Sequence, residues 1–194
     1  MSKYYKHKLG SFYLLGAFDG HFYIKDKILK LIEDNKYETL QEEAGVFSNR
    51  ITKLDWSSGK DLNREWAKFC YPILQEELTK IINQIGYVEC HIEDLWFQQY
   101  YHNDTHAWHV HGHNFTFVYY LELDEHSPKT ELIDPADQNK IIIPDIKEGD
   151  ILIFPSYVIH RAPVINNNIR KTIISANITA IDPNVNTIPI INTL

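Results

Sequence analysis

The sequence contains few cysteines and no long apolar run. Cys70 and Cys90 are the only two in 194 residues, and they form neither a CxxC pair nor a disulfide framework, which favours a reducing compartment. The amino-terminal stretch MSKYYKHKLG lacks the apolar segment of a secretion signal, and no apolar run is long enough to span a bilayer. We therefore expect a soluble cytoplasmic protein that does not bind a membrane.

An excess of positive charge is also absent. The formal net charge is -7, whereas binding to a duplex phosphate backbone depends on clustered Lys and Arg, so we expect no duplex nucleic-acid partner. This argument leaves binding to an exposed single strand open. With 44% hydrophobic and 13% aromatic residues, the chain can bury one sizeable core and is predicted to form one domain.

The amino-terminal part mixes a strand with helical patterns. The run SFYLLGA at residues 11–17 predicts a strand, and KDKILKLIEDNK at residues 25–36 has the apolar spacing of a short amphipathic helix. The run AGVFSNRITKLDWSSGKD at residues 44–61 is predicted to form irregular surface or an isolated strand. Asp61 is a suitable N-cap for a longer helix that runs to residue 85, in which Pro72 should kink the helix or split it in two.

From residue 87 onward the pattern changes to short apolar or alternating runs separated by turn signals. Several short strands without intervening helices favour an antiparallel sandwich or barrel, and a jelly roll fits best. The predicted fold is therefore mainly β, a double-stranded β-helix with supporting amino-terminal helices. The runs are YVECHIEDLWFQQYY, HVHGHNFTFVYYLEL, KIIIPDI, DILIFP and KTIISANITAI.

Five of the ten histidines lie between His102 and His113, within a strand-like run of aromatic and β-branched residues. Because alternate side chains of a strand share a face, His109 and His111 can reach one metal ion together. His160, which ends the later run EGDILIFPSYVIH, is the predicted third ligand. The same spacing pairs His111 with His113, so a shift of the pair by one strand step stays open.

The other histidines have simpler interpretations. A lone histidine in a strand is more often a surface or hydrogen-bonded residue than a ligand. We predict such positions for His102, His106 and His126. His113 lies on the same face as the predicted pair, so a ligand role or a supporting role stays open for it.

Taken in chain order, these motifs resemble those of the Fe(II)- and 2-oxoglutarate-dependent oxygenases. The resemblance covers roughly the C-terminal half of the chain. It concerns in particular the prolyl-hydroxylase-like branch and the small uncharacterised oxygenases of marine microbes and their phages. The matching elements are Tyr100, His109-x-His111, Tyr119-Tyr120-Leu121, Gly149-Asp150, His160 and Arg170-x-Thr172.

The resemblance implies a dioxygenase in which 2-oxoglutarate decarboxylates to succinate and CO2 while a substrate is oxidised, with hydroxylation expected. The substrate is unidentified, either a peptide side chain or a small metabolite. One domain would cover residues 1–194, with helical support and first strands in residues 1–86. Residues 87–182 would form the metal-binding β-core and residues 183–194 a C-terminal tail. If a phage encodes the chain, it would act in the host cytoplasm.

Iron(II) in such a site keeps open positions for the chelating cosubstrate 2-oxoglutarate and for dioxygen. The far carboxylate of the cosubstrate is then buried, and a guanidinium can pair with it in a bidentate way while phenol and hydroxyl groups add donors. The residues that the resemblance implies for this role are Arg170, Thr172, Tyr100 and Tyr120.

Lys171 competes with Arg170 for the cosubstrate. If the Ser and Asn that follow the basic residue in the family are matched to Ser175 and Asn177, Lys171 takes the position. The Arg-x-Thr spacing favours Arg170 instead. A solvent-facing charge at a strand edge is the ordinary alternative for Arg170.

One position departs from the family pattern. The usual ligands are two histidines and one carboxylate, and His111 stands where most relatives have Asp. His102-Asn103-Asp104 also offers a His-x-Asp pair, but its place relative to Tyr100 is wrong for the motif. We therefore predict a three-histidine site, whose neutral ligands should leave the iron more electrophilic.

Two other classes of protein stay open. A cupin-type metal protein that uses no 2-oxoglutarate also begins with His-x-His, and GDILIFPSYVIH matches its second motif. However, Phe115, Thr116 and Phe117 stand where its glutamate is expected. The other class is a non-enzymatic β-sandwich binding module, which would show no tight Fe(II) binding.

Overall fold

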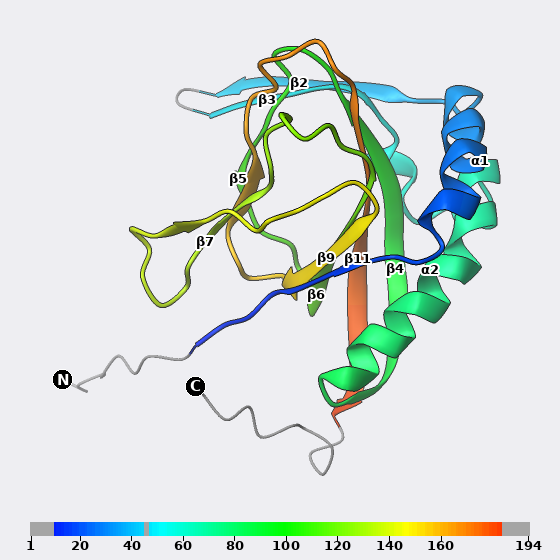
Figure 1. Ribbon diagram of the computed structural model, residues 1–194, viewed down its shortest axis with the longest axis vertical. Helices are drawn as coiled ribbons and strands as arrows, with labels where there is room; N and C mark the ends of the chain where they lie inside the picture. The colour runs from blue at the N-terminus through cyan, green and yellow to red at the C-terminus, as the bar shows by residue number, and fades with distance from the viewer. Residues whose placement is uncertain (1–9, 45–46, 184–194) are drawn as a thin grey trace.

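The computed structural model describes residues 10–44 and 47–183 of the chain. Helices lie in its amino-terminal part, and strands dominate the rest (Figure 1). None of the helices in the described ranges is long and apolar enough to cross a membrane. The elements are β1 (Leu14–Ala17), α1 (His21–Glu33), β2 (Glu38–Ala44), β3 (Phe47–Leu54), the 3-10 turn η1 (Trp56–Ser58), α2 (Glu65–Gln84), β4 (Tyr87–Tyr100), β5 (His106–His109), β6 (Phe115–Glu122), β7 (Glu131–Ile133), β8 (Ile141–Ile142), β9 (Asp150–Pro155), β10 (His160–Ala162) and β11 (Lys171–Pro183).

The strands form two antiparallel sheets. The large sheet has the order β1-β9-β6-β11-β4-β3-β2, and the small sheet has the order β5-β10-β7-β8. This mainly β arrangement with two supporting helices agrees with the predicted jelly-roll class. Within the described ranges neither sheet closes on itself.

Alternate residues of the large sheet pack into two separate cores, because successive side chains of a strand point to opposite faces. One face packs against the helices, where Ile174 of β11 joins Leu78 of α2 in an apolar cluster. Figure 1 shows both helices on this side of β4 and β11. The opposite face packs against the small sheet, where Ile173 of β11 joins Leu132 of β7. The space between the two sheets holds the candidate site.

Helix α2 differs from the sequence prediction at its start. It begins at Glu65 with Arg64 in the N-cap position, three residues after the predicted N-cap Asp61. The Asp61 side chain instead accepts a hydrogen bond from the Asn63 main-chain N–H at 3.0 Å, which stabilises a turn before the helix. Pro72 lies inside α2 and does not split it.

Strand β3 lies in the run that the sequence predicted to be irregular surface or an isolated strand, and it pairs with β2. The sequence did not indicate its partner, because β2, ETLQEEA, lies at the edge of the large sheet and carries little apolar alternation. The end of β3 pairs with β4 through Lys53 and Leu54, and Arg50 forms a β-bridge with Thr105. These contacts hold the hairpin beside the chain that leads into β5.

Candidate metal centre

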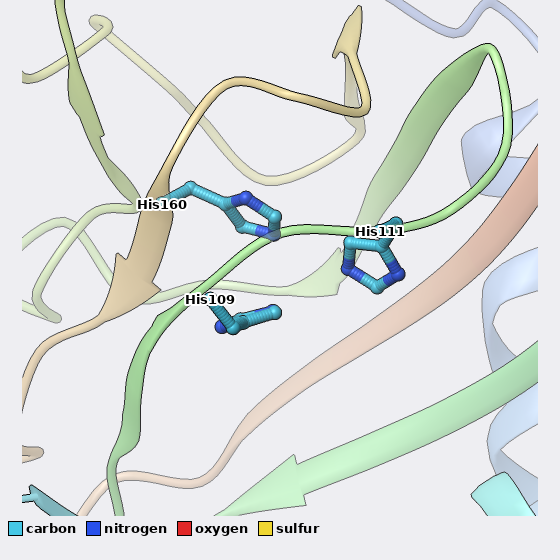
Figure 2. A group of neighbouring side chains, drawn as sticks. All are labelled: His109, His111 and His160. Atoms are coloured by element: carbon cyan, nitrogen blue, oxygen red, sulfur yellow. The ribbon is translucent and has the colours of Figure 1, made fainter.

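Three histidines converge between the two sheets. One ring nitrogen from each of His109, His111 and His160 lies within 4.8 Å of the others, so the three can share one metal ion. Figure 2 shows the three rings facing a common space from two separate segments of the chain. His109 and His160 are direct partners in the antiparallel β5–β10 pair. His111 is fixed by its main-chain N–H, which donates to the Ser156 carbonyl at 3.0 Å.

Main-chain carbonyls orient two of the three rings. Nδ1 of His109 lies 2.7 Å from the Ala107 carbonyl oxygen, and Nδ1 of His160 lies 3.0 Å from the Val158 carbonyl oxygen. A carbonyl oxygen only accepts, so each Nδ1 carries the proton and each neutral ring keeps a lone pair on Nε2. Such rings are arranged as metal ligands are, with the second nitrogen held by an oxygen.

Burial keeps the cluster neutral. It lowers the pKa of His109 and lowers that of His160 strongly, because a charged ring is poorly solvated there. At His160 the neighbouring histidines also disfavour a second charge. Burial also lowers the pKa of His111 to about 4. All three are therefore unprotonated at neutral pH and can donate to a metal without first losing a proton. A set of imidazole donors suits Fe, Zn, Cu or Ni.

A fourth histidine, His106, lies in the same place and was missed. Its ring stacks on that of His109 with centroids 3.8 Å apart, and burial lowers its pKa to about 3. Strict alternation puts residues three apart on opposite faces of a strand, so the sequence pattern separated His106 from His109. The register shift between His160 and Ala162 brings the two rings together.

The other candidate histidines lie away from the cluster. His102, His113 and His126 are exposed, and His102 Nδ1 lies 3.3 Å from the Asn167 carbonyl. Asp104, from the alternative His-x-Asp pair, is fully buried and accepts hydrogen bonds from the main chain of Thr52 and Tyr101. The structure therefore brings together the predicted trio and neither alternative set.

A narrow cavity extends from the histidines between the sheets. It is lined by residues from both sheets, including Gln98 and Ser175 of the large sheet and Arg161 of the small sheet. Thr130, also in the lining, shares a hydrogen bond of 2.6 Å with Tyr120 through the two hydroxyl groups. The cavity lining is Trp96, Gln98, Tyr100, His106, His109, His111, Thr116, Val118, Thr130, His160, Arg161, Ala162, Ile173 and Ser175.

Lys171 is the cation on the inner face of β11. Its side chain is fully buried, its Nζ donates to the Pro128 carbonyl at 2.9 Å, and Nζ lies 5.7 Å and 5.8 Å from the ring centroids of Tyr100 and Tyr120. Burial lowers its pKa to about 7. An ammonium held among two phenol rings can receive a carboxylate as its counter-ion.

Arg170 and Thr172 lie elsewhere. Arg170 makes a bidentate pair with Glu122, with Nε and Nη2 at 2.8 Å and 2.7 Å from its two carboxylate oxygens. The Thr172 hydroxyl also donates to Glu122. These contacts leave the Arg170 guanidinium with a partner already. The structure thus joins Tyr100 and Tyr120 with Lys171 and keeps Arg170 and Thr172 apart from them.

Solved structures with low sequence identity share the fold of this chain. No protein-family model and no curated protein matches the sequence. An oxidoreductase of the 2OG-Fe(II) oxygenase family from Burkholderia pseudomallei has 12% identity and a TM-score of 0.68, over 93% of this chain and 89% of that chain. A Pseudomonas putida prolyl-4-hydroxylase has 14% identity and a TM-score of 0.59, over 88% of this chain and 93% of that chain.

A prolyl hydroxylase from Trichoplax adhaerens, solved with a peptide fragment of hypoxia inducible factor, is also similar. It has 17% identity and a TM-score of 0.60, over 88% of this chain and 83% of that chain. At these identities the likeness concerns the fold. The chain has the fold of the 2OG-Fe(II) oxygenases, and the resemblance predicted from its motifs is confirmed at that level.

Proposed function

We propose that this protein is an Fe(II)- and 2-oxoglutarate-dependent dioxygenase that couples decarboxylation of 2-oxoglutarate to oxidation, with hydroxylation expected, of a substrate. One observation carries the proposal: three convergent imidazoles and a buried lysine lie on the inner faces of two sheets in the fold of this family. In this proposal the two sheets act as one double-stranded β-helix within a single domain of residues 1–194.

The metal would be held by His109, His111 and His160. When bound, Fe(II) supplies the open coordination positions and the redox chemistry that dioxygen activation requires. The protein contributes orientation, since the carbonyl partners of His109 and His160 fix which ring nitrogen is free. It also excludes bulk water, because His160 is 5% exposed and the cavity is narrow.

The cosubstrate's far carboxylate would pair with Lys171, flanked by Tyr100 and Tyr120. Lys171 has no carboxylate partner among the described residues, whereas Arg170 is already paired with Glu122. A buried cation without a counter-ion is costly, so an incoming carboxylate gains from meeting it. The contacts therefore favour the Lys171 register over Arg170 and Thr172, the alternative from the Arg-x-Thr spacing.

The substrate and the place of action are also proposals. A peptide side chain is one candidate, because the similar Trichoplax enzyme is solved with a peptide, and a small metabolite is the other. We propose the cytoplasm as the compartment, since Cys70 and Cys90 are free and buried. Residues 87–182 would be the metal-binding core and residues 1–86 its support. The predicted tail, residues 183–194, lies outside the described residues except for Pro183.

A cupin-type metal protein that uses no 2-oxoglutarate is the second candidate. The specific observation in its favour is the ligand set, which offers three imidazoles and no carboxylate. A cupin-type protein would give the buried Lys171 no role. A binding module without metal is a third and weaker alternative, because histidines that merely pack have no need of convergent free nitrogens.

The deciding experiment is uncoupled turnover. Purified protein is given Fe(II), dioxygen and 2-oxoglutarate without substrate, and succinate is measured. Slow, iron-dependent succinate formation supports the oxygenase. Tight Fe(II) binding without succinate would favour the cupin-type alternative, and absence of tight Fe(II) binding would favour the binding module.

A further inference from the structure

The three imidazoles of the candidate centre differ in what holds them. His109 and His160 each direct Nδ1 at the main-chain carbonyl two residues earlier. In the part of the chain that the structure describes, no such carbonyl bonds to the His111 ring. Because metal-bound histidines almost always donate their second ring N–H to an oxygen, His111 needs a different partner.

Asn177 offers that oxygen. It lies on β11, its side chain is buried, and its Oδ1 is without a hydrogen-bond partner among the described residues. A buried amide oxygen without a partner is costly, so a donor is expected to face it. The other end of the amide is fixed, because Nδ2 donates to Asp94 Oδ2 at 2.9 Å from the opposite position on β4.

Strand pairing places Asn177 in the neighbourhood of His111. Asn177 is the antiparallel partner of Thr116, whose hydroxyl lies 3.2 Å from the Ser156 hydroxyl. The Ser156 carbonyl accepts the main-chain N–H of His111. A group that favours a ring N–H on one nitrogen also strengthens the donor ability of the other. Trp96 completes the surroundings, because its ring stacks on that of His111 with centroids 5.9 Å apart.

We propose that Asp94 and Asn177 form a relay that positions His111 and supplies the metal site with a remote negative charge. Most relatives place a carboxylate directly on the metal. Here the Asp94 carboxylate would act on the metal through the side chains of Asn177 and His111. This inference rests on the proposed metal centre. It names Asn177 and Asp94 as positioning residues, neither of which touches the metal.

The test is titration of the metal-free full-length chain with Co(II) alone, whose visible absorption reports both occupancy and ligand field. Asn177→Leu keeps the side-chain volume and removes both polar atoms, so Co(II) should bind about 10- to 100-fold more weakly with a shifted band. Asp94→Asn keeps an acceptor for Asn177 and removes the charge, so we expect a smaller loss of about 3- to 10-fold. Asn177→Asp should retain or tighten binding.

The matched control is a second Asn–Asp pair away from the histidines. Asn35 Nδ2 donates to Asp55 Oδ2 at 3.1 Å, so Asn35→Leu makes the same chemical change and should leave Co(II) affinity and absorption unaltered. If the wild type binds no Co(II), the proposed centre and the relay are both wrong. If the wild type binds Co(II) and the Asn177→Leu and Asp94→Asn variants bind it with the same affinity and absorption, the relay alone is wrong. Should Asn177→Leu not fold, Asp94→Asn decides.

Discussion

The two faces of the large sheet carry different chemistry although they belong to the same strands. On the helix side, β11 presents Ile174 and Ala176 to a core of aliphatic and aromatic side chains. On the inner side, the same strand buries the polar residues Lys171, Ser175 and Asn177, and Ser175 lines the cavity of the candidate site. One face can bury apolar area without penalty, whereas the other buries polar groups that need partners.

This contrast separates the source of stability from the source of activity. The helix-side core gains free energy from close packing and has no need of a ligand. The inner face carries groups such as Lys171 that cost stability in the free protein and gain partners only when a ligand binds. Substitutions on the two faces should therefore differ in kind as well as in size.

The largest effect is expected at the histidines. Replacing any one of His109, His111 or His160 by Ala should abolish stoichiometric Fe(II) binding, measured by equilibrium dialysis with metal analysis. Removal of one ligand leaves a two-histidine site that competes poorly with water. The controls are His102→Ala, His126→Ala and His113→Ala, all at exposed positions and all expected to keep full occupancy.

A sharper variant keeps a ligand at the same place. His111→Asp restores the two-histidine, one-carboxylate set of most relatives, so it should still bind Fe(II) and turn over 2-oxoglutarate at least as fast. Full occupancy in His109→Ala together with loss in His113→Ala would instead shift the ligands to His111, His113 and His160.

The next effect concerns the cosubstrate. Lys171→Met should weaken 2-oxoglutarate binding by about 3–5 kcal/mol, more than roughly 100-fold, because the buried carboxylate loses its charged partner. Fe(II) affinity should stay near wild type and thermal stability should not fall, since an uncompensated buried cation has been removed. Arg170→Gln, measured beside it, should leave the 2-oxoglutarate requirement unchanged. The reverse result would restore the Arg-x-Thr register.

Substitutions at two neighbouring residues of β11 allow a direct comparison of the two faces of the large sheet. Ile173 and Ile174 are both buried and differ in the face they occupy. Replacing either by Ala should lower the free energy of unfolding by about 2–4 kcal/mol, measured by urea denaturation. Only Ile173→Ala, which opens the cavity lining, should also change 2-oxoglutarate affinity. Equal binding effects from both variants would show that the two cores are not independent.

The sequence predicted the β-rich fold and the pair His109 and His111 because both depend on local periodicity, whereas His160 was predicted from its place at the end of a later apolar run. His109 and His111 share a face by alternation, and both lie in one continuous run. The choice between Arg170 and Lys171 could not be made in this way. A shift of one residue moves every side chain of a strand to the other face, and the run KTIISANI is buried on both faces.

Two further features depend on tertiary contacts. His106 reaches His109 through a register shift against β10, and such an irregularity leaves no periodic signal. Asn177 and Asp94 meet because they are direct partners in the β11–β4 pair, although 83 residues separate them in the sequence. Only the paired strands show that the Asn177 amide oxygen is buried and has no hydrogen-bond partner among the described residues.

The smallest predicted effect is a pH dependence on the inner face. Burial lowers the pKa of Lys171 to about 7 in the free protein, and a bound carboxylate should raise it again. Binding therefore needs the protonated amine, so 2-oxoglutarate affinity should be constant below pH 7 and fall as pH rises above it. The slope is at most about tenfold per pH unit, which equals roughly 1.4 kcal/mol. Lys171→Arg stays charged throughout this range, so its affinity should be flat between about pH 7 and pH 9, measured by calorimetry. A flat wild-type profile would mean that Lys171 is not the group that meets the carboxylate.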